Sequence, residues 1–180
     1  MNKEAEWKIR IVEHARVKAA IEEADVSHLF EYTLPNLGAT ESQLRRAEAS
    51  FASAQALDLN YRDFLKNANG WKAFYQSVDL FGTEELLGGG LWTLSQEKLS
   101  ALLENDGAMA ASLITRLDVM PIATSRDDLD VFFIGCGGSP FVGQILWYAG
   151  EEVERFANFA EFFESMTEYE RLRLAGLHSE

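Results

Sequence analysis

The chain has 180 residues, 47% of them hydrophobic and 12% aromatic, a composition that excludes a disordered chain and is typical of one folded domain. Its 29 acidic residues outnumber the 16 basic ones and give a formal charge of −13 at pH 7. This excess argues against nucleic acid as the partner, because phosphates are met by Lys and Arg, and it favours a basic protein.

The first predicted element is an amphipathic helix. Residues 3–24 place Trp7, Ile11, Ala15 and Ala19 at helical spacing, with charges at most of the other positions. We expect this helix to pack back on the rest of the chain through Trp7, Ile11 and Ala15. We also expect it to be an accessory to the fold, so that a chain without it still folds, with lowered stability.

The domain organisation follows from the distribution of charge. Residues 1–24 hold five basic and five acidic residues, so the whole net charge belongs to residues 25–180. We therefore expect an N-terminal helical extension over residues 1–30 and one domain over residues 31–180.

A capping box predicts the next helix. Thr40 is followed three residues later by Gln43, the spacing at which the two side chains satisfy each other's backbone N–H groups. The helix that follows would carry Leu44, Ala47 and Phe51 on one face.

A short helix and a pair of strands come next. Asn60 is the predicted N-cap of the helix, and Asn69-Gly70 the turn that ends it. From Trp71 the pattern alternates between apolar and polar residues, so "WKAF" and "VDLFG" are predicted strands.

Helices and strands then alternate to the end of the chain. Thr83 is the predicted cap of "TEELL", Ser95 opens a helix, and Asn158 with Glu161 forms a capping pair for the last helix. Between these helices, "LDVMPIA", "LDVFFIG", "FVGQILWYA" and "EVERFA" have strand length and indicate an antiparallel meander. The predicted class is α+β, with a mixed or antiparallel sheet wrapped by helices.

Residues 131–150 run for twenty positions without a charge, long enough to span a bilayer. Five glycines and Pro140 divide the run, which favours paired buried strands over a membrane span. The N-terminus lacks the apolar core of a secretory signal. The single cysteine, Cys136, has no partner for an internal disulfide, so we expect a reducing compartment, the cytoplasm.

No catalytic residue, metal ligand or cofactor site is predicted. His14, His28 and His178 are scattered along the chain, and no metal-binding or phosphate-binding motif is present. A lone cysteine flanked by strand residues is typical of packing, so Cys136 is expected to be structural. The chain is therefore predicted not to be an enzyme, although an active carboxylate cluster hidden from sequence patterns stays open as an alternative.

Three acidic clusters of the main body are the predicted partner-binding residues, because they stand at predicted strand ends and helix starts where carboxylates reach outward. Sequence alone leaves open whether the clusters share one edge or face. They are Glu84 and Glu85; Asp127, Asp128 and Asp130; and Glu151, Glu152 and Glu154.

Four stretches follow one another in the chain: "ATESQLRRAEASF", "LNYRDFLKNANGW", "DLFGTEEL" and "GQILWYAGEEVERFANFAEFFESM". In this order they resemble the SUKH superfamily, which includes the fungal cell-wall-assembly regulators of SMI/KNR type. The resemblance covers roughly residues 36 to 166, and two departures stand out: Asp58-Leu59-Asn60 replaces the proline common before the tyrosine helix, and the first thirty or so residues have no counterpart. The motif positions are Glu48, Tyr61, Phe64, Leu65, Asn69, Gly70, Phe81, Gly82, Phe159 and Phe162.

This resemblance implies an α+β fold and, for bacterial members, an immunity protein that neutralises a cognate polymorphic toxin, often a nuclease. The acidic charge agrees with that function, since a nuclease site attracts phosphate and an acidic protein can cover it. The alternative is a regulatory scaffold of the SMI/KNR kind that binds cellular partners. The toxin's identity and the oligomeric state are not predicted.

Overall fold

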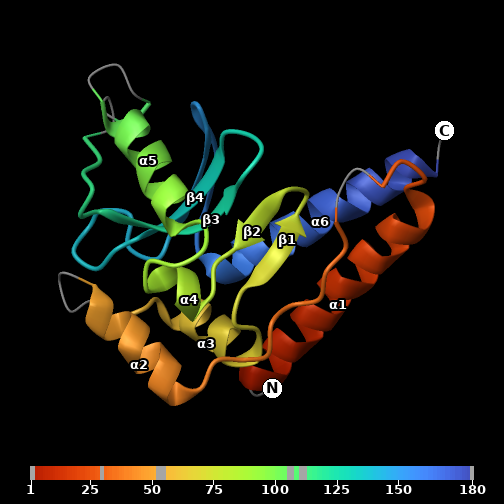
Figure 1. Cartoon of the computed structure of the whole chain (residues 1–180), viewed down its shortest axis with the longest axis horizontal. Coiled ribbons are helices and arrows are strands. Elements are labelled where there is room, and N and C mark those ends of the chain that lie inside the picture. Colours follow the sequence, from red (N-terminus) through yellow and green to blue (C-terminus); the bar gives the residue numbers. More distant parts are fainter. Residues whose placement is uncertain (1–2, 29–30, 52–55, 105–107, 110–112, 179–180) are drawn as a thin grey trace.

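Six strands form one antiparallel sheet in which every strand pairs with its neighbour in the chain, in the order β1 to β6. The computed structural model describes residues 3–28, 31–51, 56–104, 108–109 and 113–178. Helices lie on both faces of the sheet, so the predicted α+β class and the meander are confirmed (Figure 1). The strands are β1 (Trp71–Tyr75), β2 (Val78–Leu80), β3 (Val119–Ser125), β4 (Asp130–Gly135), β5 (Ile145–Ala149) and β6 (Glu152–Phe156).

Two helices cover opposite faces of this sheet. Phe133 and Tyr148 point to the face that α5 covers through Leu99, while Phe132 points to the face that α6 covers through Phe162. Helix α1 in turn lies against α6 (Figure 1). The helices are α1 (Lys3–Ala24), α2 (Glu41–Ser50), α3 (Leu59–Asn67), α4 (Thr83–Leu86), α5 (Trp92–Leu103) and α6 (Phe159–Leu177).

The charge-free stretch at residues 131–150 forms most of β4 and all of β5, as predicted, with the two strands paired. Within the described part of the chain, no helix is both long enough and apolar enough to cross a bilayer.

Several predicted helix starts are confirmed and others are corrected. The Thr40 and Gln43 capping box is present, with the Thr40 N–H donating to Gln43 Oε1 at 2.8 Å. Asn158 caps α6 by accepting from the backbone N–H groups of residues 160 and 161. The cap of α3 is Asp58 rather than Asn60, because the Asp58 carboxylate accepts from the N–H groups of residues 60 and 61.

The two helices after β2 also begin earlier than predicted. Thr83 is the first residue of α4, and Glu85 satisfies the N–H of the preceding Gly82 at 2.9 Å. Helix α5 begins at Trp92, so Ser95 lies within its first turn and not at its start. The glycines between α4 and α5 mark a loop but do not indicate the residue at which α5 begins.

Helix α1 shares the main hydrophobic core. Trp7 is buried and its ring meets those of Phe64, Phe159 and Phe163 at 5.7, 5.6 and 5.5 Å between centroids. Ile11 is also buried in this cluster, and Ala15 packs against it, as the sequence predicted. The expected boundary after residue 30 falls on a residue outside the described ranges.

The same helix covers the edge strand β1. His14 Nε2 lies 2.9 Å from the Phe74 carbonyl oxygen and its Nδ1 lies 2.9 Å from Thr167 Oγ1 of α6. Lys18 donates to the Ala73 carbonyl oxygen, and both side chains are buried. Since an uncovered edge strand offers unpaired backbone groups to other chains, α1 closes this side of the sheet.

Candidate functional site

The three hairpin turns of the sheet lie at one end of it. The pairs Tyr75↔Val78, Thr124↔Val131 and Tyr148↔Glu152 place each turn beside the next, because the strands are antiparallel and consecutive. We call this the turn end of the sheet; it comprises residues 76–77, 126–129 and 150–151.

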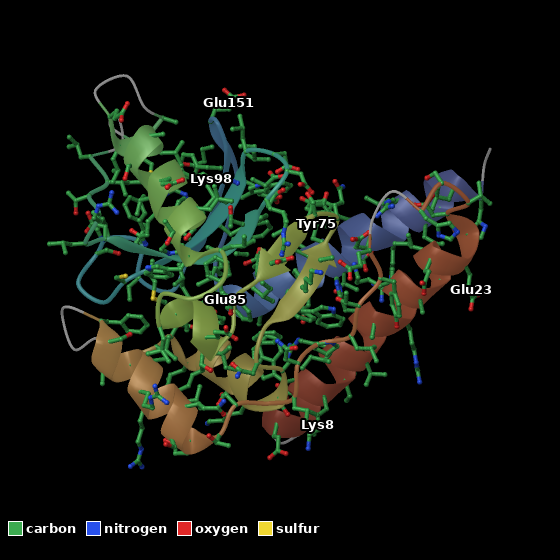
Figure 2. All side chains as sticks on the ribbon, in the orientation of Figure 1. Lys8, Glu23, Tyr75, Glu85, Lys98 and Glu151 are labelled. Carbon is green, nitrogen blue, oxygen red and sulfur yellow. The ribbon has the colours of Figure 1, made fainter. Side chains whose placement is uncertain are left out.

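The turn end brings two of the three predicted acidic clusters together. Asp130 pairs with Ala149 across β4 and β5, so the turns that carry Asp128 and Glu151 are neighbours. Glu84 and Glu85 lie on α4, which follows the other end of β2. Figure 2 shows this separation, with Glu151 at the tip of its hairpin and Glu85 far from it.

Two carboxylates at the turn end point outward without an internal partner. Asp127 and Glu151 are both exposed, and neither side chain forms a hydrogen bond or ion pair with a described residue. Their carboxylates are therefore hydrated and available, as a surface that meets a basic partner requires.

Asp128 and Asp130 instead shape the turn. Asp128 accepts from the Asp130 N–H at 3.0 Å and from Ser77 Oγ at 3.2 Å, which links the first two turns. Asp130 accepts from Trp147 Nε1 at 2.6 Å. Burial raises the pKa of Asp130, with the nearby charge of Asp128 acting in the same direction.

Lys98 of α5 contacts the same turn from the face of the sheet that α5 covers (Figure 2). Its ammonium donates to the carbonyl oxygens of Ser125, Asp128 and Asp130 at 2.6, 2.8 and 3.2 Å and to Thr124 Oγ1 at 2.9 Å. Burial lowers the pKa of Lys98, while the charges of Asp128 and Asp130 oppose the shift. One lysine thus fixes the backbone that displays Asp127.

Lys98 was missed by the sequence reasoning, although a signal was present. It lies three residues after Ser95 and four before Leu102, both buried on the inner face of α5. A lysine at an inward position has to find oxygen acceptors, and a neighbouring turn is where free carbonyl groups are found.

The remaining predicted residues are engaged within the protein. Glu152 accepts from Tyr148 OH at 3.0 Å and pairs with Arg155 at 2.8 Å, and Glu154 accepts from Tyr169 OH. This bond to Glu154 raises the pKa of Tyr169 to about 12. On α4, Glu85 caps Gly82, whereas Glu84 is exposed.

The groups considered for catalysis have different surroundings. His14 is buried beside β1, His28 lies after α1, and His178 caps the end of α6. Burial, with Asp118 nearby, raises the pKa of Cys136 to about 11, so the thiol is protonated at neutral pH. Among the residues that the structure describes, no three His, Cys, Asp or Glu side chains gather around a common point.

Four of the motif residues, Tyr61, Asn69, Phe81 and Gly82, contact one another where α3 meets the end of β2. Tyr61 OH donates to the Phe81 carbonyl oxygen at 2.8 Å, and the Asn69 side chain accepts from the Thr83 N–H at 2.8 Å. A Cβ on Gly82 would lie 2.3 Å from the Asn69 carbonyl oxygen, so only glycine fits there. These residues join α3 to β2 and α4, and their role is structural.

A family model, the SMI1 / KNR4 family (SUKH-1), matches residues 38–165 of this chain. The chain belongs to this family. The match begins after α1 and ends within α6, so the helix that covers β1 lies outside it. Domains of the SMI1 / KNR4 family are typically immunity or scaffold proteins without enzymatic activity. None of the curated proteins matches the chain.

Proposed function

We propose that this SMI1 / KNR4 family member is an immunity protein that binds a cognate toxin domain, of nuclease type, and covers its basic active site with the turn end of the sheet. The observation that carries the proposal is the pair of outward carboxylates, Asp127 and Glu151, on neighbouring hairpin turns. The chain has a net charge of −13, and these two carboxylates form a surface complementary to a basic partner, one whose active site attracts phosphate.

The rigidity of the turn end supports the same proposal. The Lys98 ammonium, Asp128 and Trp147 tie the β3–β4 turn to α5 and to β5. A surface that is already ordered loses less conformational entropy on binding than a mobile loop does. Binding at this end needs no catalytic group, and we propose that the protein has none.

The test is charge reversal at the two free carboxylates, Asp127→Lys with Glu151→Lys. The partner is first sought as a basic toxin domain encoded beside this gene, and it is then titrated by calorimetry at two salt concentrations. We expect slower association, a weaker affinity and a smaller salt dependence, because exposed charges act through steering. Reversing Asp128 and Asp130 is less informative, since both also hold the turn together.

Two controls match this variant. Glu22→Lys with Glu23→Lys makes the same change in net charge at exposed positions in the last turn of α1 and should leave binding intact. Cys136→Ala should keep full protection against the toxin if the thiol is structural. Unchanged affinity and salt dependence after charge reversal at residues 127 and 151 would show that the turn end is not part of the interface.

The regulatory scaffold remains the second candidate, because the matching family model is named for SMI1 and KNR4. A scaffold would bind a cellular protein and would give no protection against any toxin domain found by that search. Survival of toxin-expressing cells with and without this chain separates the two functions.

A further inference from the structure

An apolar cavity of about 590 Å³ lies at the end of the sheet opposite to the turn end. Its walls come from residues 50–51 and 56–59, from α5, from the start of β3 and from the connection between β4 and β5. This volume lies within the range of roughly 300–1,000 Å³ that small-molecule sites occupy. The aliphatic and aromatic lining includes Leu57, Trp92, Leu99, Val119, Met120 and Ile134.

The mouth of the cavity is also apolar. Leu59, Leu117 and Val142 line it and are exposed by 69%, 76% and 62%. Large aliphatic side chains at such exposure, gathered around a hollow, are typical of a binding site and not of an ordinary surface.

One cation, at an exposed position, lies beside the apolar lining. Arg116 lines the cavity, and its guanidinium donates to Gln96 Oε1 and Ser100 Oγ of α5, each at 2.6 Å. A guanidinium has five N–H donors, so three remain without a partner among the described residues. Arg116 forms no ion pair with a described carboxylate, in a protein with an excess of acidic residues.

The described lining holds one carboxylate. It is that of Asp58, which accepts from the N–H groups at the start of α3 and forms no ion pair with Arg116. The nearby Cys136 is a protonated thiol at neutral pH. Arg116 is therefore free to pair with an anion that enters from outside.

We propose that this cavity binds a small amphiphilic anion, with an apolar body among Trp92, Leu99 and Ile134 and a carboxylate or sulfonate paired with Arg116. The anchored guanidinium gives the ligand its orientation, and the apolar walls give it most of its affinity. The site is independent of the turn end and of the proposed toxin partner.

The probe is anilinonaphthalene sulfonate, an aromatic anion whose fluorescence reports an apolar environment. We expect saturable binding at one site on the folded full chain, and displacement by dodecanoate at roughly tenfold lower concentration than by dodecanol. Arg116→Gln should weaken both anions roughly tenfold, the scale of one lost charge-assisted hydrogen bond. Phenylnaphthylamine, which has no charge, should bind the wild type and the variant equally.

The control is Arg46→Gln, which removes an exposed arginine of α2 that does not line the cavity. Cys136 gives a second readout, because it lines the cavity and is the only thiol in the chain. Bound probe should slow its alkylation by a maleimide. Absence of saturable binding, equal affinity of wild type and Arg116→Gln, or an unchanged alkylation rate would each overturn the proposal.

Discussion

His14 is a neutral side chain with a defined tautomer. The Phe74 carbonyl oxygen accepts only, so Nε2 carries the proton and donates to it. Burial lowers the pKa of His14 to about 3. The charges of Lys18 and Arg171 lower this pKa further, whereas the hydrogen bond to Phe74 raises it. In the neutral ring Nδ1 accepts, so it shares the single Thr167 hydroxyl proton with the Phe163 carbonyl oxygen, which lies 2.9 Å from Thr167 Oγ1.

This burial makes the stability of the fold sensitive to mild acid. The folded-state pKa of about 3 lies below the ordinary value of 6.5, so the unfolded chain binds a proton that the folded chain does not. The free energy of unfolding should fall as pH falls below 6.5, by about 1.4 kcal/mol per pH unit. At pH 5 the loss is about 2 kcal/mol relative to pH 7.5, measured by urea denaturation.

Substitution of His14 separates its contribution to the pH dependence of stability from that of the other titratable groups. His14→Gln should be less stable at pH 7.5 but should lose this part of the pH dependence between pH 7.5 and 5. His28→Gln, at an exposed position, should keep the wild-type profile. Identical profiles for the wild type and His14→Gln would show that His14 does not control the acid response.

Sequence patterns identify single residues well where the partner is local. Thr40 and Gln43 lie three residues apart, and their reciprocal bonds follow from helix geometry alone. The partners of His14 are 60 and 153 residues away in the chain, so no local pattern reveals them. Only the assembled core shows that this histidine is buried.

Helix α5 and the β3–β4 turn act as one unit through Lys98. Lys98→Met keeps most of the apolar stem but leaves four oxygen atoms without the ammonium that they accept from. We expect the free energy of unfolding to fall by about 1–3 kcal/mol. Amide hydrogen exchange should accelerate at residues 126–130, since the turn loses its anchor.

Lys8→Met is the matched control, because Lys8 is exposed on α1, away from the turn (Figure 2), and pairs with Glu4 of the same helix. It should change neither stability nor exchange in the turn. If Lys98→Met gave wild-type exchange at residues 126–130, the turn would be held by Asp128 and Trp147 without the lysine.

The predictability of elements varied with the residues at their ends. Strands β1, β4 and β6 were predicted to within one residue at each end, whereas the stretch predicted for β5 began four residues early, at Phe141. The start of α3 was placed at Asn60 although Asp58 caps it, since both residue types are good N-caps and only the fold selects one. Helix α5 begins without a side-chain cap, so no residue marks it.

At the scale of the molecule, α1 and α6 join the two ends of the chain. Deleting residues 1–24 should lower the melting temperature and broaden the transition, because it exposes Phe64, Phe163 and the β1 edge. We expect a folded product, since the family match begins only at residue 38. Calorimetry and circular dichroism measure both properties.

Trp7→Ala in the full chain tests the same contact without removing the helix. It should cost about 3–5 kcal/mol, the usual range for a large aromatic residue lost from a core. Ile9→Ala, on the exposed face of α1, should cost little. Loss of all cooperative unfolding in the truncated chain would show that α1 belongs to the nucleus of the fold.

The candidate site was predicted in part. The acidic character and the residues of the β3–β4 and β5–β6 turns followed from the sequence, since charges at strand ends point outward. Their adjacency required the register between β4 and β5, and the position of Glu84 and Glu85 at a distance required the course of β2. The cavity beside Arg116 has walls from four separate segments, which no sequence pattern brings together.

The pairing of α1 with α6 also sets an order of events during protein synthesis. Trp7 and Arg10 leave the ribosome early, whereas their partners Phe163 and Glu164 follow roughly 150 residues later. At about 5–20 residues per second, the face of α1 that meets α6 has no final partner for on the order of ten seconds. Phe64 and the β1 edge emerge much sooner and can pack on α1 in that interval, so the α6 side of the core is the last part of the newborn protein to be closed.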